Sequence, residues 1–136
     1  MRPRRSCFDD KAGDLAVLRN IHASLRPGGA LAMDVVGKEI MMRIFQATTS
    51  AVEPDGTLLV QRHEIFDEAT RIRNEWILVK GDRARTFKFH HTLYSGQELR
   101  SLLKQAGFAS VRLCGSLDGE EYSPAGRRLI AVAVKK

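Results

Sequence analysis

The stretch LRNIHASLRPGGALAMDV, residues 18–35, decides the fold of this 136-residue chain. Its first half has apolar residues at helical spacing, and Arg26-Pro27-Gly28-Gly29 ends the helix, because proline cannot continue it and glycine takes the left-handed turn. We expect this helix to begin near Asp14, with Asp10 or Asp14 as its cap. Residues 30–36 are short, apolar and bounded by glycines, which predicts a strand buried on both faces, as in a parallel sheet.

The middle of the chain changes to a period of two. Three alternating segments are predicted as strands: residues 57–66, 70–79 and 85–94. Asp67-Glu68-Ala69 and Lys80-Gly81-Asp82 fit the hairpin turns between them. The segments therefore predict a three-stranded antiparallel meander with one dry and one wet face, and we expect Trp76 on the dry face.

Before and after the meander, the pattern predicts alternating helices and strands. A helix pattern covers residues 38–45, and a loop centred on residues 53–56 follows it. Ser95-Gly96-Gln97-Glu98 is a capping box that opens a second helix, which Gly107 ends. Residues 108–114 and 129–134 have the apolar composition of buried strands.

Composition excludes several classes of protein. The net charge of +6 includes Arg2, Arg4 and Arg5, and the other basic residues are scattered among acids, which disfavours a nucleic-acid surface. No apolar run has the length of a membrane span, and no hydrophobic signal segment follows the basic start, so we expect a cytoplasmic protein without a membrane partner. The two cysteines, Cys7 and Cys114, form neither a disulfide framework nor a metal motif, and the histidines show no metal-ligand spacing.

Five segments together resemble class I S-adenosylmethionine-dependent methyltransferases. The match covers about residue 8 to the end and consists of LRNIHASLRPGGALAMDV, GKEIMMRIF, LYSGQEL, SGQELRSLLKQAGFASVRL and RRLIAVAVKK. The first, fourth and fifth resemble the family's fifth, sixth and seventh strands with their helices. The second and third, with the hairpins, resemble a small-molecule branch in which the meander is an insert beside the acceptor pocket.

The resemblance implies an α/β fold: a partial Rossmann-like methyltransferase sheet of strands five, six and seven with flanking helices, plus the three-stranded meander. It implies one domain over residues 1–136, with residues 57–94 as the antiparallel insert. It also implies S-adenosylmethionine as the cofactor of the intact enzyme. The chain lacks the family's glycine-rich turn after strand one and the acid after strand two, so we expect no cofactor bound by this chain alone. An excised fragment, a mis-started reading frame and a truncated gene product all fit this pattern.

Five residues are candidates for binding the acceptor substrate. Lys38 and Glu39 lie just past the carboxyl end of the strand at 30–36, where open α/β sheets bind ligands. His63 and His91 lie on the meander, where a general base fits, and Tyr94 closes its third strand. Each also has a structural reading, as a surface, capping or packing residue. The catalytic base is not identified.

Other residues allow the same two readings. His90 and His91 point to opposite faces, so at most one faces the pocket. Trp76 is a core residue or a stacking platform for the acceptor, and Asp34 is a hydrogen-bonded strand acid or a pocket acid. Glu64 is a cross-strand partner or a base. Arg43 and Arg62 are surface charges or contacts for an anionic acceptor.

Three functional hypotheses remain from the sequence. The first is S-adenosylmethionine-dependent methyl transfer to a small-molecule acceptor, with this chain supplying the acceptor-side half. The second is a non-catalytic binding or oligomerisation module derived from a methyltransferase, and the third is a basic nucleic-acid-binding domain. We also expect self-association, as a homodimer or larger, because one edge of the strand at 30–36 has no partner strand in the sequence and carries no proline or lysine to protect it.

Overall fold

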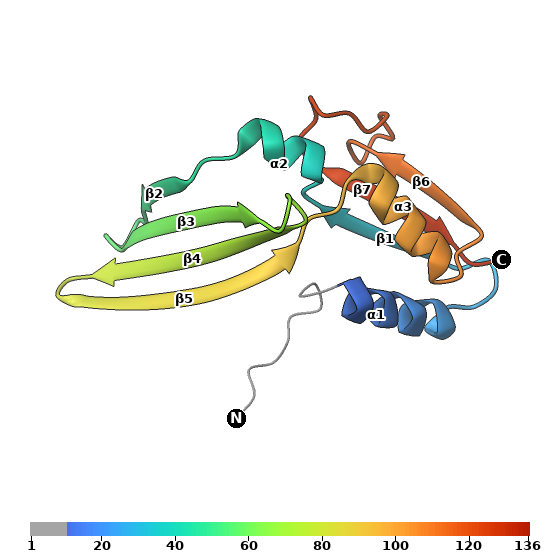
Figure 1. Cartoon of the computed structure of the whole chain (residues 1–136), viewed down its shortest axis with the longest axis horizontal. Coiled ribbons are helices and arrows are strands. Elements are labelled where there is room, and N and C mark those ends of the chain that lie inside the picture. The colour runs from blue at the N-terminus through green and yellow to red at the C-terminus, as the bar shows by residue number, and fades with distance from the viewer. Residues whose placement is uncertain (1–10) are drawn as a thin grey trace. The chain divides into compact units, whose positions relative to one another are not determined.

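The computed structural model describes residues 11–136, so the basic N-terminal segment and Cys7 lie outside the described part. The described residues form three helices and seven strands in two antiparallel sheets (Figure 1). The chain divides into two compact units, Met1–Ile44 with Leu93–Lys136 and Phe45–Thr92. The mixed α/β fold class predicted from the sequence is confirmed.

The first unit is a three-stranded sheet with helices. Its elements are α1 (Lys11–Ser24), β1 (Ala30–Val35), α2 (Lys38–Ile44), α3 (Gly96–Gln105), β6 (Ser110–Cys114) and β7 (Leu129–Val134). The strand order is β1-β7-β6, with β7 antiparallel to both neighbours. Strands β1 and β6 therefore run in the same direction, and their carboxyl ends lie at the same edge of the sheet.

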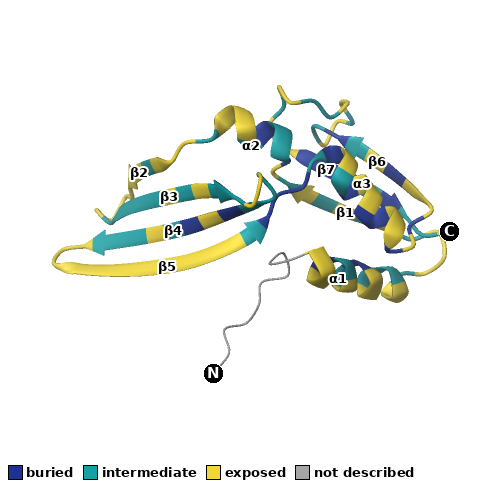
Figure 2. Cartoon of the chain, viewed as in Figure 1, coloured by how far each residue is buried: buried dark blue, intermediate teal, exposed yellow. Residues whose placement is uncertain are grey.

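The core of this unit lies between the sheet and helices α1 and α3 (Figure 2). It is built from one face of α3, the inward positions of β6 and β7, and Leu18 of α1. Its buried members are Leu18, Tyr94, Leu99, Leu102, Leu103, Ala106, Phe108, Val111, Leu129, Ala131 and Ala133. The i, i+3, i+4 spacing on α3 places its leucines on a single face, as the sequence predicts.

Strand β1 differs from its prediction. We expected a strand buried on both faces, but its residues alternate between exposed and half-buried. It pairs antiparallel with β7 through the register Ala30↔Val134 to Val35↔Leu129. Within residues 11–136 no strand pairs with its other edge, so β1 is an edge strand here.

Of the two predicted caps of α1, Asp10 lies outside the described residues. The helix is described from Lys11, so Asp14 lies within its first turn rather than at its cap. The Asp14 side chain is 1% exposed and accepts a hydrogen bond from the Tyr94 hydroxyl. From the sequence, an acidic residue at the start of an apolar helical repeat is interpreted as a cap. The partner of Asp14, Tyr94, is too distant in the sequence to be predicted.

Helix α3 confirms the predicted capping box. Ser95 accepts a hydrogen bond from the Glu98 N–H, and the Glu98 carboxylate accepts one from the Ser95 N–H. These bonds satisfy N–H groups that a helix N-terminus otherwise leaves without partners. The start of α3 is therefore fixed from its own sequence.

The second unit is a single antiparallel sheet in the order β2-β3-β4-β5. Its strands are β2 (Thr48–Val52), β3 (Leu58–Phe66), β4 (Arg71–Lys80) and β5 (Arg83–Thr92). The predicted three-stranded antiparallel meander is confirmed as β3, β4 and β5, and β2, which was not predicted, pairs with β3 as a fourth strand. The TTSAV sequence of β2 lacks the large apolar residues that signal a strand, and its place in the sheet comes from pairing rather than from pattern.

Both predicted hairpin turns are confirmed. Strands β3 and β4 pair up to Phe66↔Arg71, and β4 and β5 pair up to Lys80↔Arg83. The tighter second turn needs a left-handed residue, which Gly81 supplies with a φ of 61°.

The placement of Trp76 in the dry core was wrong. On its face of the sheet, Ile72 and Asn74 are buried, at 1% and 4% exposure, but Trp76 is 38% exposed. Phe89 and Phe87 on the same face are 40% and 48% exposed. The physical reason is that this unit is a single sheet, without a second layer of its own to cover the face.

No helix within residues 11–136 combines the length and apolar character that a membrane crossing requires.

Candidate functional site

The polar residues of the first unit gather at one edge of its sheet. Lys38 and Glu39 open α2 just beyond β1, and Ser95 opens α3. Because β1 and β6 run in the same direction, the segment after β6, which includes Tyr122, also starts at this edge. Ligands of open α/β sheets bind outside the carboxyl ends of strands. We therefore take this edge as the first candidate site.

Glu39 is held by two donors. The Tyr122 hydroxyl donates to its Oε2 at 2.5 Å, and the Gly96 N–H donates to its Oε1 at 3.0 Å. Partial burial acts to raise the pKa of Glu39, but these hydrogen bonds and one from its own N–H outweigh burial and lower the pKa. The pKa of Tyr122 is raised by burial and by the adjacent Glu39 carboxylate. The pair thus stays a carboxylate and a neutral phenol at neutral pH.

Lys38 is held by Glu98 of the capping box. Its Nζ lies 2.6 Å from one carboxylate oxygen of Glu98, and Lys11 approaches the other at 3.2 Å. Burial acts to raise the pKa of Glu98, but the two lysines and the Ser95 cap lower it to about 2. Lys38 and Glu39, predicted as substrate-binding residues, thus lie together but already have intramolecular partners.

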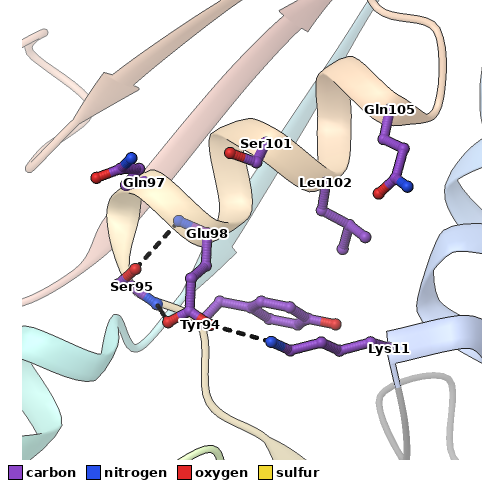
Figure 3. A pocket seen from close by; sticks show the side chains of 8 residues that line it. All are labelled: Lys11, Tyr94, Ser95, Gln97, Glu98, Ser101, Leu102 and Gln105. Carbon is purple, nitrogen blue, oxygen red and sulfur yellow. Dashed lines mark hydrogen bonds and ion pairs between the residues drawn. The ribbon is translucent and has the colours of Figure 1, made fainter.

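Tyr94 lies beside an open pocket of about 320 Å³ (Figure 3). The pocket is lined by Lys11, Tyr94, Ser95, Gln97, Glu98, Ser101, Leu102 and Gln105. The Tyr94 ring is 5% exposed, and its hydroxyl donates to Asp14. The wall of the pocket is therefore built on a buried carboxylate–phenol contact that the sequence analysis did not find.

The described residues do not fit the donor site of the family that the sequence resembles. Such a site needs a glycine-rich turn between a strand and a helix. Gly28 and Gly29 join α1 to β1, which is the wrong order. Gly37 follows β1 and precedes α2, but a Cβ added to it would lie 2.2 Å from the Tyr122 hydroxyl. Tyr122 therefore fills the space in which a ligand would approach this backbone.

The second candidate site lies within the second unit, on one face of its sheet. His63 on β3 is paired with Asn74 on β4. On β5 the partner of Asn74 is Phe89, and His91 lies two residues further along β5 on the same face. The His63 Nδ1 lies 2.7 Å from the Asn74 Oδ1, and the Asn74 Nδ2 lies 3.4 Å from the His91 Nδ1. Two predicted site residues are thus joined through the buried side-chain amide of Asn74, which was not predicted as a site residue.

Aromatic rings adjoin this row on the same face. Phe89 is opposite Asn74, and Trp76 is opposite Phe87. The Trp76 and Phe89 rings meet edge to face, with centroids 5.5 Å apart. Exposed aromatic faces beside imidazole and amide groups suit a ligand with both a nonpolar ring surface and polar substituents.

Several alternatives from the sequence have structural partners. Glu64 pairs with Arg73, and Arg62 with Glu75, on the opposite face of the same sheet. In the first unit, Arg43 donates to the carbonyls of Pro124 and Gly126, and Asp34 pairs with Arg128. These contacts favour surface or structural roles. Among residues 11–136 no group of three or more potential ligands could hold a metal ion.

No family model matches the chain, and no curated protein matches it. Solved structures do match it, and those named below are S-adenosylmethionine-dependent or other methyltransferases of Rossmann-like fold. The chain therefore has the fold of part of an S-adenosylmethionine-dependent methyltransferase, as the sequence resemblance implied.

The structure of the CcbJ methyltransferase from Streptomyces caelestis matches 96% of this chain, with a TM-score of 0.77 and 15% identity. CalS10, an amino pentose methyltransferase from Micromonospora echinaspora, matches 95% with a TM-score of 0.60 and 18% identity. The sugar N-methyltransferase KedS8 from Streptoalloteichus sp. matches 93% with a TM-score of 0.59 and 20% identity. The matches cover 56%, 53% and 50% of those chains, so this chain spans about half of their length.

Proposed function

We propose that this chain is the acceptor-side part of an S-adenosylmethionine-dependent methyltransferase that acts on a small molecule. The observation that carries the proposal is that nearly the whole chain matches about half the length of each of these solved methyltransferases. Fold alone does not define chemistry, so the rest of the proposal depends on the two candidate sites.

The methyl donor, in this proposal, is bound by polypeptide outside residues 11–136. The geometry around Gly37 supports this, because Tyr122 fills the space over this glycine, which lies between β1 and α2 at the candidate edge. When bound, S-adenosylmethionine supplies a methyl group on a positively charged sulfur. Titration calorimetry of the 136-residue chain with S-adenosylmethionine tests this part, and a micromolar dissociation constant would contradict it.

The acceptor, in this proposal, carries an amine or hydroxyl group on a saturated ring, as an amino sugar does. Trp76 and Phe89 offer ring faces on which such a ring can stack, and His63, with Asn74 behind it, offers hydrogen bonding nearby. The names of KedS8 and CalS10, a sugar N-methyltransferase and an amino pentose methyltransferase, support the same class. The residues of the first site, which are satisfied by one another, serve here to fix α2 and α3.

Acceptor binding can be tested without the donor. We expect free and nucleotide-linked amino sugars at millimolar concentration to move the backbone amide NMR signals of His63, Asn74 and Trp76 in the labelled chain. Trp76→Ala should weaken this response, whereas Thr86→Ala, on the other face of the sheet, should not. Absent shifts, or shifts confined to the first unit, would contradict the assignment.

One observation favours an alternative, a non-catalytic binding or oligomerisation module. The same exposed aromatic residues, Trp76, Phe87 and Phe89, have the composition of a protein interface. The same NMR titration distinguishes the two functions. The signals of a protein interface would shift with protein concentration and would not shift when amino sugars are added.

A further inference from the structure

The side-chain amide of Asn74 contacts both His63 and His91. The orientation of this amide determines which ring nitrogen of each histidine carries the hydrogen. Asn74 is 4% exposed, and its amide lies between the two rings. Its oxygen faces the Nδ1 of His63 at 2.7 Å, and its nitrogen faces the Nδ1 of His91 at 3.4 Å. A side-chain amide has one accepting end and one donating end, so it makes opposite demands on its two neighbours.

The two histidines are therefore required to take opposite tautomers. The Asn74 oxygen can only accept, so the Nδ1 of His63 must carry the hydrogen and its Nε2 must carry the lone pair. The Asn74 nitrogen can only donate, so the Nδ1 of His91 must carry the lone pair and its Nε2 the hydrogen. The shorter contact, at His63, is the stronger of the two.

We propose that Asn74 is a positioning residue that makes the Nε2 of His63 a proton acceptor and the Nε2 of His91 a hydrogen-bond donor on this face of the sheet. No residue of the described part bonds the Nε2 of His63, so its lone pair is available to a ligand. A group that donates a hydrogen bond, such as an ammonium, amine or hydroxyl, fits there.

Its role in methyl transfer rests on the proposed function. An amine or hydroxyl must lose a proton as it becomes a nucleophile, and His63 takes that proton on Nε2 to become an imidazolium. The Asn74 oxygen keeps its hydrogen bond to the Nδ1 hydrogen in both protonation states, so the ring need not turn when the proton arrives. In the neutral Nε2–H tautomer of His63, the lone pair would lie on Nδ1 and face the buried Asn74 amide. The amine or hydroxyl of a substrate could not reach it there.

The test reads the tautomers directly and needs no acceptor or methyl donor. Long-range proton–nitrogen NMR spectra of the ¹⁵N-labelled chain at about pH 8.5, roughly two units above the ordinary histidine pKa, distinguish the two neutral forms of each ring. His63→Gln and His91→Gln assign the signals. We expect His63 mainly as Nδ1–H and His91 mainly as Nε2–H. The reverse arrangement, or His63 as Nε2–H, would overturn the proposal.

Variants of the amide sharpen the result. In Asn74→Leu we expect His63 to move to the Nε2–H form that a free neutral imidazole prefers, while Gln61→Leu, on the same face of β3, leaves both rings unchanged. Asn74→Asp keeps the size of the side chain and only accepts when ionised, so both rings should become Nδ1–H. Unchanged rings in both Asn74 variants would overturn the proposal. Because these NMR readouts do not involve methyl transfer, they can confirm or overturn this proposal whether or not the proposed function is correct.

Discussion

The Tyr122 hydroxyl donates to Glu39 across 2.5 Å, and this contact joins the segment after β6 to the first turn of α2. The same Glu39 carboxylate accepts from the Gly96 N–H at the start of α3. One carboxylate therefore fixes three segments that meet at the carboxyl edge of the sheet. Gly37 is part of the arrangement, because only a residue without a side chain leaves room for the phenol.

Tyr122 and Gly37 should be energetically coupled. Tyr122→Phe removes a hydrogen bond to a carboxylate and should lower the free energy of unfolding by about 1–2 kcal/mol. Gly37→Ala should cost about 1–3 kcal/mol through the clash with the hydroxyl. In the double variant the contact with the hydroxyl is removed and only the ring carbon at 3.0 Å remains close, so the combined loss should fall about 1 kcal/mol short of the sum. Urea unfolding of the four proteins measures this, and strict additivity would show that the two residues do not touch.

The Glu98 carboxylate predicts a loss of stability in acid. Its pKa is lowered from 4.5 to about 2 in the folded chain, so its contribution is complete above about pH 4.5 and is lost as the pH falls towards 2. Allowing for solvent screening, the contribution is about 1 kcal/mol. Unfolding free energies at pH 7, 4 and 2.5 should fall less steeply for Glu98→Gln than for the parent. Glu53→Gln is the matched control, and identical slopes for parent and Glu98→Gln would exclude this role for Glu98.

Ile72→Ala should lower the free energy of unfolding more than Trp76→Ala does, although tryptophan is the larger side chain. Ile72 is 1% exposed, and Ile72→Ala should cost about 3 kcal/mol. Trp76 is 38% exposed and retains mainly its edge-to-face contact with Phe89, so Trp76→Ala should cost only about 1–2 kcal/mol. Denaturant unfolding of both variants decides the order. A larger loss for Trp76 would mean that its face is covered in solution.

Self-association of the 136-residue chain is expected through the outer edge of β1. The Lys135 N–H bonds to the Gly29 carbonyl, and the alternation of an antiparallel ladder then directs the backbone groups of Ala30, Ala32 and Asp34 away from β7. Bare edge groups of this kind pair readily with a second chain. We expect sedimentation velocity at micromolar concentration to show a species of twice the 15.2 kDa monomer.

The edge itself can be blocked to test that mechanism. Ala32→Pro removes one outward N–H and should leave a monomer, because proline is tolerated where the missing N–H faced solvent. Ala32→Val keeps the N–H and should behave like the parent. A monomeric parent, or a dimeric Ala32→Pro variant, would rule out pairing at this edge.

The sequence predicts those elements whose signal is local. The capping box at Ser95, the turn at Gly81 and the leucine face of α3 depend on neighbours within a few residues, and all three are found. The contact of Asp14 with Tyr94 joins residues 80 apart, and that of Tyr122 with Glu39 joins residues 83 apart. No pattern in the sequence marks such pairs.

The candidate site shows the same division. Period-two patterning groups Asn74 with Ile72 and groups His91 with Phe89, each within its own strand. Only the register of the strands shows that His63 shares this face and that the amide lies between the rings. The exposure of Trp76 was missed for a related reason. An apolar stripe shows which residues share a face, but not whether another layer covers that face.

Methyl transfer is the most direct test of the account. The longest polypeptide encoded in frame through these 136 residues and the 136-residue chain alone should be compared, with radiolabelled S-adenosylmethionine and a panel of amino sugars and other small amines and alcohols. We predict that the longer polypeptide methylates an amine or hydroxyl of a ring acceptor, that its His63→Gln variant has a lower kcat, and that the chain alone transfers nothing. Transfer by the 136-residue chain alone, or no transfer by the longer polypeptide to any acceptor of this class, would contradict the account.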